Sequence, residues 1–336
     1  MSLVKRIIKS AIANALYYSG MLSFLKKNKL SNKSFVLMYH RVLPSSLMES
    51  IHSTGGIVTD VELFSRHLDW LKEEFTILSV PELINIFEQG REIPSGSCVI
   101  TFDDGWWDNY EFAKPLLEKK AVPAMIFLPY DYIGNDLVFW QEELLARLLA
   151  LALSEDLSQQ AKLREITGLQ GDLDKQSLRD YITGLKTLDY DEINAVLSEL
   201  REIQSNIEVD LTNDRYLDWA QVDRMSRSVI KFGSHSLSHR MLTHIDRNEA
   251  KHEINESKRL LDEKLGGGVQ AIAYPNGNSD EQIEKMAENA GYSIGFSTKP
   301  GYISKESNKM RLSRINVHTN NSVSKPIFLC HILNIF

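Results

Sequence analysis

The chain has 336 residues, of which 43% are hydrophobic and 25% charged, so it can bury the core of one large α/β domain or two smaller ones. The formal net charge is −7, although residues 1–48 hold eight basic residues and no acidic one. The rest of the chain contains 30 basic and 45 acidic residues, so its formal net charge is −15. This excess argues against nucleic acid as a partner, because phosphate binding depends on Lys and Arg. The two cysteines, Cys98 and Cys330, indicate neither a metal site nor a disulfide framework.

The first 33 residues form a basic segment with the pattern of an amphipathic helix. Its apolar positions are Leu3, Ile7, Ile8, Ile12, Ala15, Leu16 and Leu22. No apolar run approaches the ~20 residues that span a bilayer, and no signal-peptide core with a cleavage site is evident. Two interpretations stay open. Residues 1–30 lie on an anionic membrane, which would place the protein in the cytoplasm at the inner face, or they form a solvated helix packed on the next domain.

Residues 34–336 alternate apolar, β-rich runs with amphipathic helical stretches, which favours a parallel sheet built from βα units. The runs are Phe35–Tyr39, Cys98–Phe102, Ala124–Leu128, Val229–Phe232, Val269–Tyr274, Ser293–Ser297 and Leu312–Val317. Seven runs predict an α/β fold of the distorted (β/α) barrel type, with about seven parallel strands.

Helix signals complete this domain. Asp246 and the glycines at 266–268 delimit a helix. Residues 140–216 interrupt the alternation with Leu-rich and charged helical patterns and few β signals. We therefore predict an inserted helical region at 140–216 within the barrel domain.

Two short motifs follow predicted strands. Asp103 and Asp104 come directly after Val99–Phe102, and His235 and His239 come after Val229–Phe232. Parallel α/β folds carry their active sites at the carboxyl ends of strands. Each motif alone is more often structural. Together they can supply one carboxylate and two imidazoles to a divalent metal and leave one carboxylate as a base. The spacing of four predicts that both histidines lie on one side of a helical turn.

These motifs closely resemble the polysaccharide deacetylases of carbohydrate esterase family 4, in the form of its surface- and exopolysaccharide branch. The resemblance covers roughly residues 35–320 and includes Thr101–Gly105, Gly233–His239, Leu37–Val42, Ala273–Gly277 and Gly291-Tyr292. It implies that Asp103 is the general base and that Asp104, His235 and His239 are the metal ligands. A His, His, Asp set suits zinc best and also admits cobalt, nickel or iron.

The chain departs from the commonest pattern of this family at two points. Ala273 occupies the position where many members carry an arginine that orients the base, and Arg314 or Arg41 is a candidate replacement. The family also takes its general acid from a histidine near the end of the domain. His318 is the best match, and His40, which also ends a strand, is the rival.

Other side chains are candidates for substrate contact. Sugars stack on aromatic rings, so Trp106 or Trp107 lines the cleft unless it packs in the core. Tyr274, Pro275 and Arg314 are further candidates. A backbone N–H near Gly105 or Tyr274 is a candidate oxyanion donor.

The function that the resemblance implies is metal-dependent removal of an N-acetyl group from a sugar of a surface polysaccharide, lipopolysaccharide or glycolipid intermediate. Two alternatives stay open: a small-molecule amide hydrolase, and a non-catalytic polysaccharide-binding or scaffold protein on the same fold.

Overall fold

The computed structural model describes residues 3–171, 173–185, 188, 190–204 and 209–336. The remaining residues of the predicted N-terminal segment (1–2) and of the predicted insertion (172, 186–187, 189 and 205–208) lie outside the described residues. The chain divides into two compact units. The first consists of Met1–Ser45, Gly55–Asn135 and Tyr216–Phe336, and the second of Ser46–Thr54 and Asp136–Arg215.

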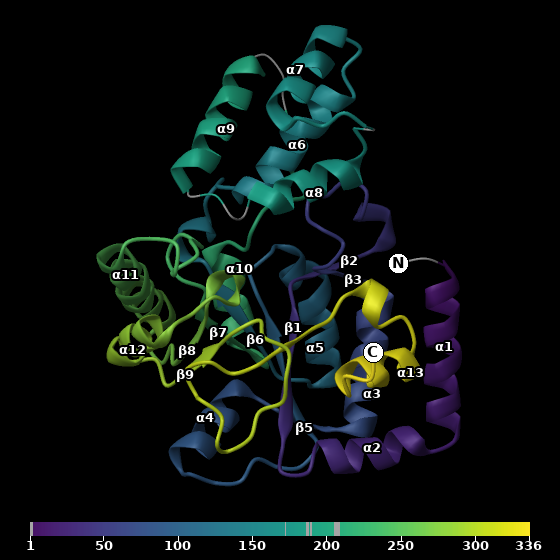
Figure 1. Ribbon diagram of the computed structural model, residues 1–336. Helices are drawn as coiled ribbons and strands as arrows, with labels where there is room; N and C mark the ends of the chain where they lie inside the picture. The colour runs from purple at the N-terminus through teal and green to yellow at the C-terminus, as the bar shows by residue number, and fades with distance from the viewer. Residues whose placement is uncertain (1–2, 172, 186–187, 189, 205–208) are drawn as a thin grey trace. The chain divides into compact units, whose positions relative to one another are not determined.

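The first unit is built on a parallel sheet (Figure 1). Its strands follow the spatial order β10 (Ile315–Asn316), β1 (Ser34–Tyr39), β5 (Ser97–Phe102), β6 (Ala124–Leu128), β7 (Ile230–Ser234), β8 (Ala271–Ala273) and β9 (Ile294–Phe296). A parallel bridge between Phe296 and Leu312 brings β9 beside the residues that lead into β10. The predicted distorted (β/α) barrel of about seven parallel strands is confirmed.

One further strand, β4 (Thr76–Leu78), pairs with the first half of β5, while β6 pairs with its second half. Sequence analysis missed β4 because three residues are too few for a periodic pattern. A separate parallel pair joins β2 (Arg41–Leu43) to β3 (Val58–Asp60).

The strands form where the sequence is continuously apolar, because both of their faces are covered. Every residue of β1, β5 and β6 is buried. One apolar cluster draws Val36, Val99, Phe127 and Phe296 from four of the strands and packs them with residues of α4.

Helices and short turns connect the strands of this unit. The helices are α1 (Leu3–Tyr18), α2 (Met21–Lys29), α3 (Val61–Glu74), α4 (Val80–Glu88), α5 (Lys114–Lys120), α10 (Trp219–Ser226), α11 (Arg247–Leu265), α12 (Glu281–Asn289) and α13 (Lys325–Ile332). Shorter helical segments lie at Ser45–Leu47, Asn109–Ala113, Tyr130–Tyr132, Pro275–Gly277 and Thr319–Asn321. Helix α11 begins and ends where Asp246 and Gly266 predict. The Asp246 side chain accepts a hydrogen bond from the Asn248 N–H, and Gly266 adopts φ 76°.

The second unit is helical, as the patterns within residues 140–216 predict. It contains α6 (Trp140–Ala152), α7 (Leu157–Thr167), α8 (Lys175–Leu185) and α9 (Tyr190–Ile203). These helices enclose an apolar core of their own, in which Leu148, Leu163, Leu178 and Leu200 are fully buried. A separate core explains why this stretch interrupts the strand pattern.

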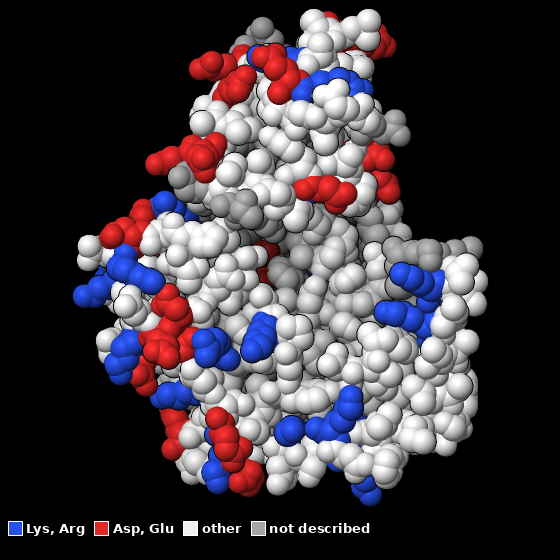
Figure 2. Space-filling view, in the orientation of Figure 1, with Lys and Arg blue, Asp and Glu red and all other residues white. Residues whose placement is uncertain are grey.

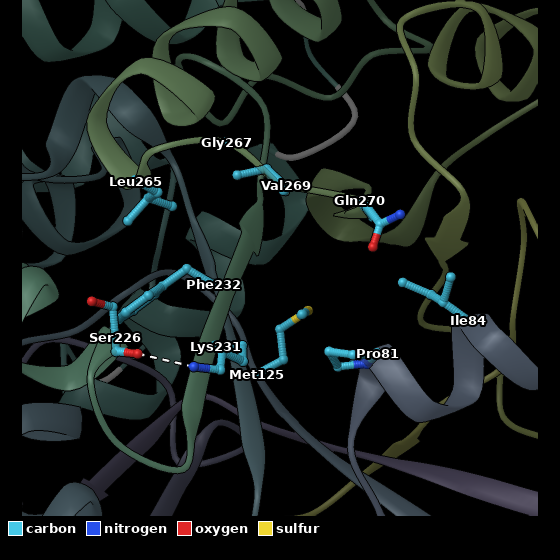
Figure 3. Close-up of a pocket in the computed structure, with 11 residues that line it drawn as sticks. Pro81, Ile84, Met125, Ser226, Lys231, Phe232, Leu265, Gly267, Val269 and Gln270 are labelled. Atoms are coloured by element: carbon cyan, nitrogen blue, oxygen red, sulfur yellow. Dashed lines mark hydrogen bonds between the residues drawn. The ribbon is translucent and has the colours of Figure 1, made fainter.

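The barrel has two functionally different ends. At the amino-terminal ends of β6, β7 and β8 lies a hollow of about 270 Å³ lined by Met125, Phe232, Lys231 and Gln270 (Figure 3). Its one cation, Lys231, donates to the Ser226 carbonyl oxygen at 3.0 Å. None of the predicted site residues lines this hollow, since they follow the opposite ends of the strands.

Candidate active site

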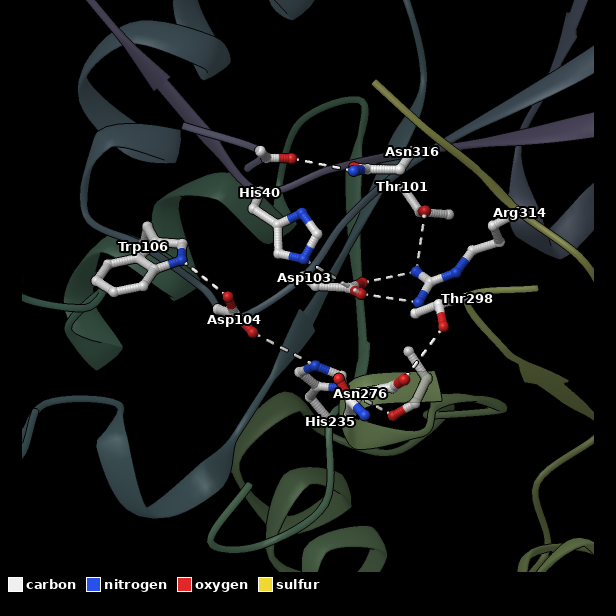
Figure 4. Close-up of polar contacts among 12 residues, drawn as sticks. His40, Thr101, Asp103, Asp104, Trp106, His235, Asn276, Thr298, Arg314 and Asn316 are labelled. Atoms are coloured by element: carbon white, nitrogen blue, oxygen red, sulfur yellow. Dashed lines mark hydrogen bonds and ion pairs between the residues drawn. The ribbon is translucent and has the colours of Figure 1, made fainter. Parts of the chain in front are cut away.

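Asp103 and Asp104 occupy the turn that follows β5 (Figure 4). Asp104 adopts φ 73° and Gly105 φ 64°, so two consecutive left-handed residues reverse the chain abruptly. A Cβ at Gly105 would lie 2.8 Å from Leu128 Cδ2, so only glycine fits there. The sharp turn sends the two neighbouring carboxylates to different partners.

Asp104 lies between two imidazoles and an indole. Its Oδ1 is 3.4 Å from the Nε2 atoms of both His235 and His239. Its Oδ2 accepts a hydrogen bond from Trp106 Nε1 at 3.0 Å. The indole therefore fixes the rotation of the carboxylate and leaves Oδ1 directed at the histidines.

The histidine segment after β7 is an irregular loop, which corrects the predicted helical turn. Ser236 and His239 adopt left-handed φ values of 64° and 59°. The His239 N–H donates to Ser236 Oγ at 3.1 Å, and the Ser236 N–H donates to Ser234 Oγ at 3.2 Å. These serine contacts replace the helical ladder while still bringing both rings to Asp104.

Glu253, a buried residue of α11, secures this loop and was missed by sequence analysis. Its Oε2 accepts hydrogen bonds from the backbone N–H groups of Leu237 and Ser238, both at 2.9 Å, and its Oε1 accepts one from Ser238 Oγ. In the sequence, Glu253 stands out only as an acidic residue on the apolar face of a predicted helix. That position alone does not show which groups its carboxylate binds.

The Asp104, His235 and His239 trio fits a divalent metal. The candidate ligand atoms lie within 4.8 Å of one another. Two ligands at zinc distances of about 2.0–2.1 Å and a tetrahedral angle are separated by roughly 3.4 Å, which matches both contacts of Asp104 Oδ1. These three residues would hold the ion.

The orientation of His235 supports this fit. Its Nδ1 lies 2.7 Å from the Ala273 carbonyl oxygen, which can only accept a hydrogen bond. In the neutral ring the Nε2 atom is therefore an acceptor, and it faces a carboxylate oxygen. A cation between them removes that conflict, and a backbone partner on the far nitrogen is the usual support of a metal-bound histidine.

Asp103 makes a buried, bidentate ion pair with Arg314. The guanidinium Nη1 and Nη2 donate to Oδ1 and Oδ2 at 2.6 and 2.7 Å, and its Nε donates to the Ser297 carbonyl oxygen at 2.9 Å. Burial raises the pKa of Asp103, but Arg314 and His235 outweigh it and hold that pKa below its usual value. Arg314 thus supplies the positive charge that Ala273 cannot, and its predicted substrate contact is corrected because the guanidinium is fully buried.

Arg41, the other candidate, serves a different carboxylate. Its Nε donates to Asp108 Oδ2 at 2.8 Å, and both side chains are fully buried. The Arg41 guanidinium also lies 4.2 Å from the centre of the Trp106 ring. Arg41 therefore supports the indole that holds Asp104.

The two candidate general acids, His40 and His318, differ in their distance from the two aspartates. His40 Nε2 is 4.0 Å from Asp103 Oδ2. For His318 the structure gives no polar side-chain contact with either aspartate; its backbone N–H donates to Asn321, and burial with the neighbouring His331 lowers its pKa to about 4. Burial lowers the pKa of His40 as well, so the choice rests on position: the ring of His40 lies beside Asp103, which favours His40 over the predicted His318.

The predicted aromatic contacts with substrate are not available. Trp106 is fully buried and stacks on Tyr216 with ring centres 4.7 Å apart. Tyr274 is also fully buried, and its hydroxyl donates to the Met310 carbonyl oxygen at 2.9 Å. Pro275 is buried at the start of a short turn. These side chains form the wall that positions the site.

Comparisons with known proteins show which family and which proteins this chain is similar to. Residues 179–295 match the polysaccharide deacetylase family, a range that contains both histidines and begins after the two aspartates. The chain is 25% identical to the poly-β-1,6-N-acetyl-D-glucosamine N-deacetylase of Staphylococcus epidermidis, over 85% of this chain and 79% of the relative. It is 23% identical to YxkH of Bacillus subtilis, over 82% and 71%.

Among solved structures, the fold is similar to that of the Streptococcus pyogenes deacetylase PplD, with a TM-score of 0.59 and 20% identity. The similarity covers 90% of this chain and 98% of that one. The family resemblance seen in the sequence is thereby confirmed.

We expect the purified protein to bind about one divalent ion per chain. His235→Ala and His239→Ala should lose it, because each removes a ligand. Metal analysis by mass spectrometry tests this, with His252→Ala, an exposed histidine of α11, as the control. Unchanged metal content in both ligand variants would contradict the assignment.

Glu253→Gln should weaken metal affinity by about 10–100-fold, because the loop that carries the histidines loses its charged acceptor. The matched control is Glu256→Gln on the same helix, whose carboxylate pairs with Arg259 at the surface. Competition with a chromogenic chelator measures both. Equal affinity in the two variants would show that the loop holds its shape without Glu253.

Proposed function

We propose that this chain, which is similar to polysaccharide deacetylases, removes the acetyl group from an N-acetylated sugar of a surface polysaccharide, lipopolysaccharide or glycolipid intermediate. It is a hydrolase that acts on carbon–nitrogen bonds other than peptide bonds. The proposal includes a role in the biosynthesis of a cell-surface polysaccharide. The observation that carries it is the ionised Asp103 beside a three-residue metal site.

A divalent metal, for which zinc is our proposal, supplies a Lewis acid that polarises the acetyl oxygen and lowers the pKa of a water molecule. Two histidines and one carboxylate leave coordination positions for water and substrate, as in catalytic rather than structural zinc sites. Asp104, His235 and His239 would hold the ion, and Trp106 and the Ala273 carbonyl orient Asp104 and His235.

Asp103 is the proposed general base. It neighbours the metal ligand Asp104 in sequence, and Arg314 holds both of its oxygens. The ion pair keeps the carboxylate ionised at neutral pH, so that it can accept a proton from the attacking water. Arg314 acts through Asp103 and is a positioning residue.

Departure of the amine requires a proton donor. His40 is our candidate, since its Nε2 lies 4.0 Å from Asp103 Oδ2 and on the same side of the site (Figure 4). Burial lowers the pKa of His40, while the two aspartates counteract that effect by favouring the protonated ring. The proton that Asp103 accepts can thus reach the leaving nitrogen through His40.

The name of the Staphylococcus epidermidis relative supports β-1,6-linked N-acetylglucosamine as the first substrate to test. The location at the inner face of a membrane is also a proposal, supported by the basic character of residues 1–48.

The proposed activity is tested by acetate release from β-1,6-linked N-acetylglucosamine oligomers, with release of an equal amount of free amine. We expect a metal chelator to abolish it. Asp103→Asn should retain the metal and lower turnover by about 10²–10⁴-fold, because only the base is lost.

Either alternative function would be visible in the same assay. Binding of oligomers without acetate release above the Asp103→Asn background would favour a polysaccharide-binding protein. Release from small N-acetyl amides alone would favour a small-molecule amide hydrolase.

His40→Ala should lower amide hydrolysis by about 10²–10³-fold with unchanged metal content, while His318→Ala should stay near wild type. An activated aryl acetate separates acid catalysis from damage to the site, because phenolate departs without protonation. His40→Ala should hydrolyse that ester nearly normally. The reverse pattern in the two variants would return the acid role to His318.

A further inference from the structure

Helix α1 turns its apolar face outward. The side chains on this face recur at helical spacing, and all are exposed, with Ile7 at 60% and Ile8 at 51% of full exposure. We call this face the outer stripe; it consists of Val4, Ile7, Ile8, Ala11, Ile12 and Ala15. A surface helix of a globular protein normally packs such a stripe on the core.

The opposite face of α1, which carries Ala13 and Tyr17, packs on the protein. Helix α1 lies beside α13 (Figure 1). Ala13, on the side opposite to Val4, is fully buried. Lys9 Nζ lies 5.0 Å from the Phe336 ring centre, and Lys325 Nζ lies 5.7 Å from that of Tyr17. These contacts that place α1 therefore involve none of the exposed apolar residues of the outer stripe.

The exposed apolar surface continues past the end of α1. Tyr18, the last residue of α1, and Met21 and Phe24 in the first turns of α2 are exposed. An uncovered apolar surface of this extent marks an interaction site.

The basic residues around this surface favour a negatively charged partner. Lys5 and Arg6 are exposed on α1, and Figure 2 shows Lys and Arg side chains beside that helix. Residues 1–48 hold eight basic residues and no acid, whereas the rest of the chain carries −15. A negatively charged surface would therefore attract this segment and repel the remainder.

The length of α1 limits how it can meet a membrane. Its 16 residues span about 24 Å. No helix within the described residues has both the length and the apolarity to cross a bilayer. An amphipathic helix of this kind lies in the plane of the interface instead.

We propose that the outer stripe and the adjoining Tyr18, Met21 and Phe24 insert into the headgroup layer of an anionic lipid bilayer and hold the protein at its surface. A second copy of the chain is a poorer occupant, because pairing two stripes brings the basic residues of both copies together. This proposal is independent of the deacetylase activity, since it rests on residues outside the active site.

The test is co-sedimentation of the full-length protein with phosphatidylglycerol-rich vesicles and with pure phosphatidylcholine vesicles. The wild type should bind the anionic vesicles more tightly, and raised salt should weaken that binding. The triple variant Ile7→Gln, Ile8→Gln, Ile12→Gln should lose at least about tenfold in affinity, because three buried side chains are removed from the lipid. Lys5→Glu should lose roughly fivefold or more.

The matched control is Leu153→Gln with Leu157→Gln, two equally exposed apolar residues of the second unit that should have no effect. Soluble oligomer hydrolysis and metal content verify that each variant is folded. Three results would overturn the proposal: equal binding by wild type and triple variant, equal binding to both vesicle types, or a lipid-free dimer that the triple variant dissociates.

Discussion

The carboxylates of Asp103 and Asp104 are adjacent and buried, and the residues around them compensate their negative charge. An unpaired buried carboxylate loses its ionisation or destabilises the fold. Asp103 receives a guanidinium that matches both of its oxygens. Asp104 receives two imidazoles and an indole N–H. Because each acid has its own partners, both stay ionised while serving different purposes.

The compensation of Asp103 depends on the pairing of β10 and β5 with opposite sides of β1. Arg314 comes from the segment before β10, whereas Asp103 follows β5, so the guanidinium extends past the end of β1 to reach the carboxylate. Loss of the pairing between β1 and β10 would separate the two side chains and leave Asp103 uncompensated.

The sequence alone was sufficient for the seven strands and for the position of the four motif residues, because both are local patterns. The strand runs are continuous, Asp103 and His235 each follow one directly, and Asp104 and His239 come within the next few residues. Pairs of residues that meet only through the tertiary structure were harder to predict. Arg314 and Arg41 were equal candidates until the barrel placed one beside Asp103 and the other beside Asp108. The sequence also does not show where a side chain points, so both the cleft and the core stayed open for Trp106, and the apolar stripe of α1 was compatible with either orientation.

The origin of Arg314 has a consequence for how this protein can be divided or recombined. The range that matches the family, residues 179–295, carries the imidazoles but neither the base nor its counter-ion. A fragment or chimera cut at these limits would inherit two of the three candidate metal ligands and neither member of the charge pair. The functional unit is therefore the closed barrel from its first strand to its last, and exchange between relatives has to move both edges together.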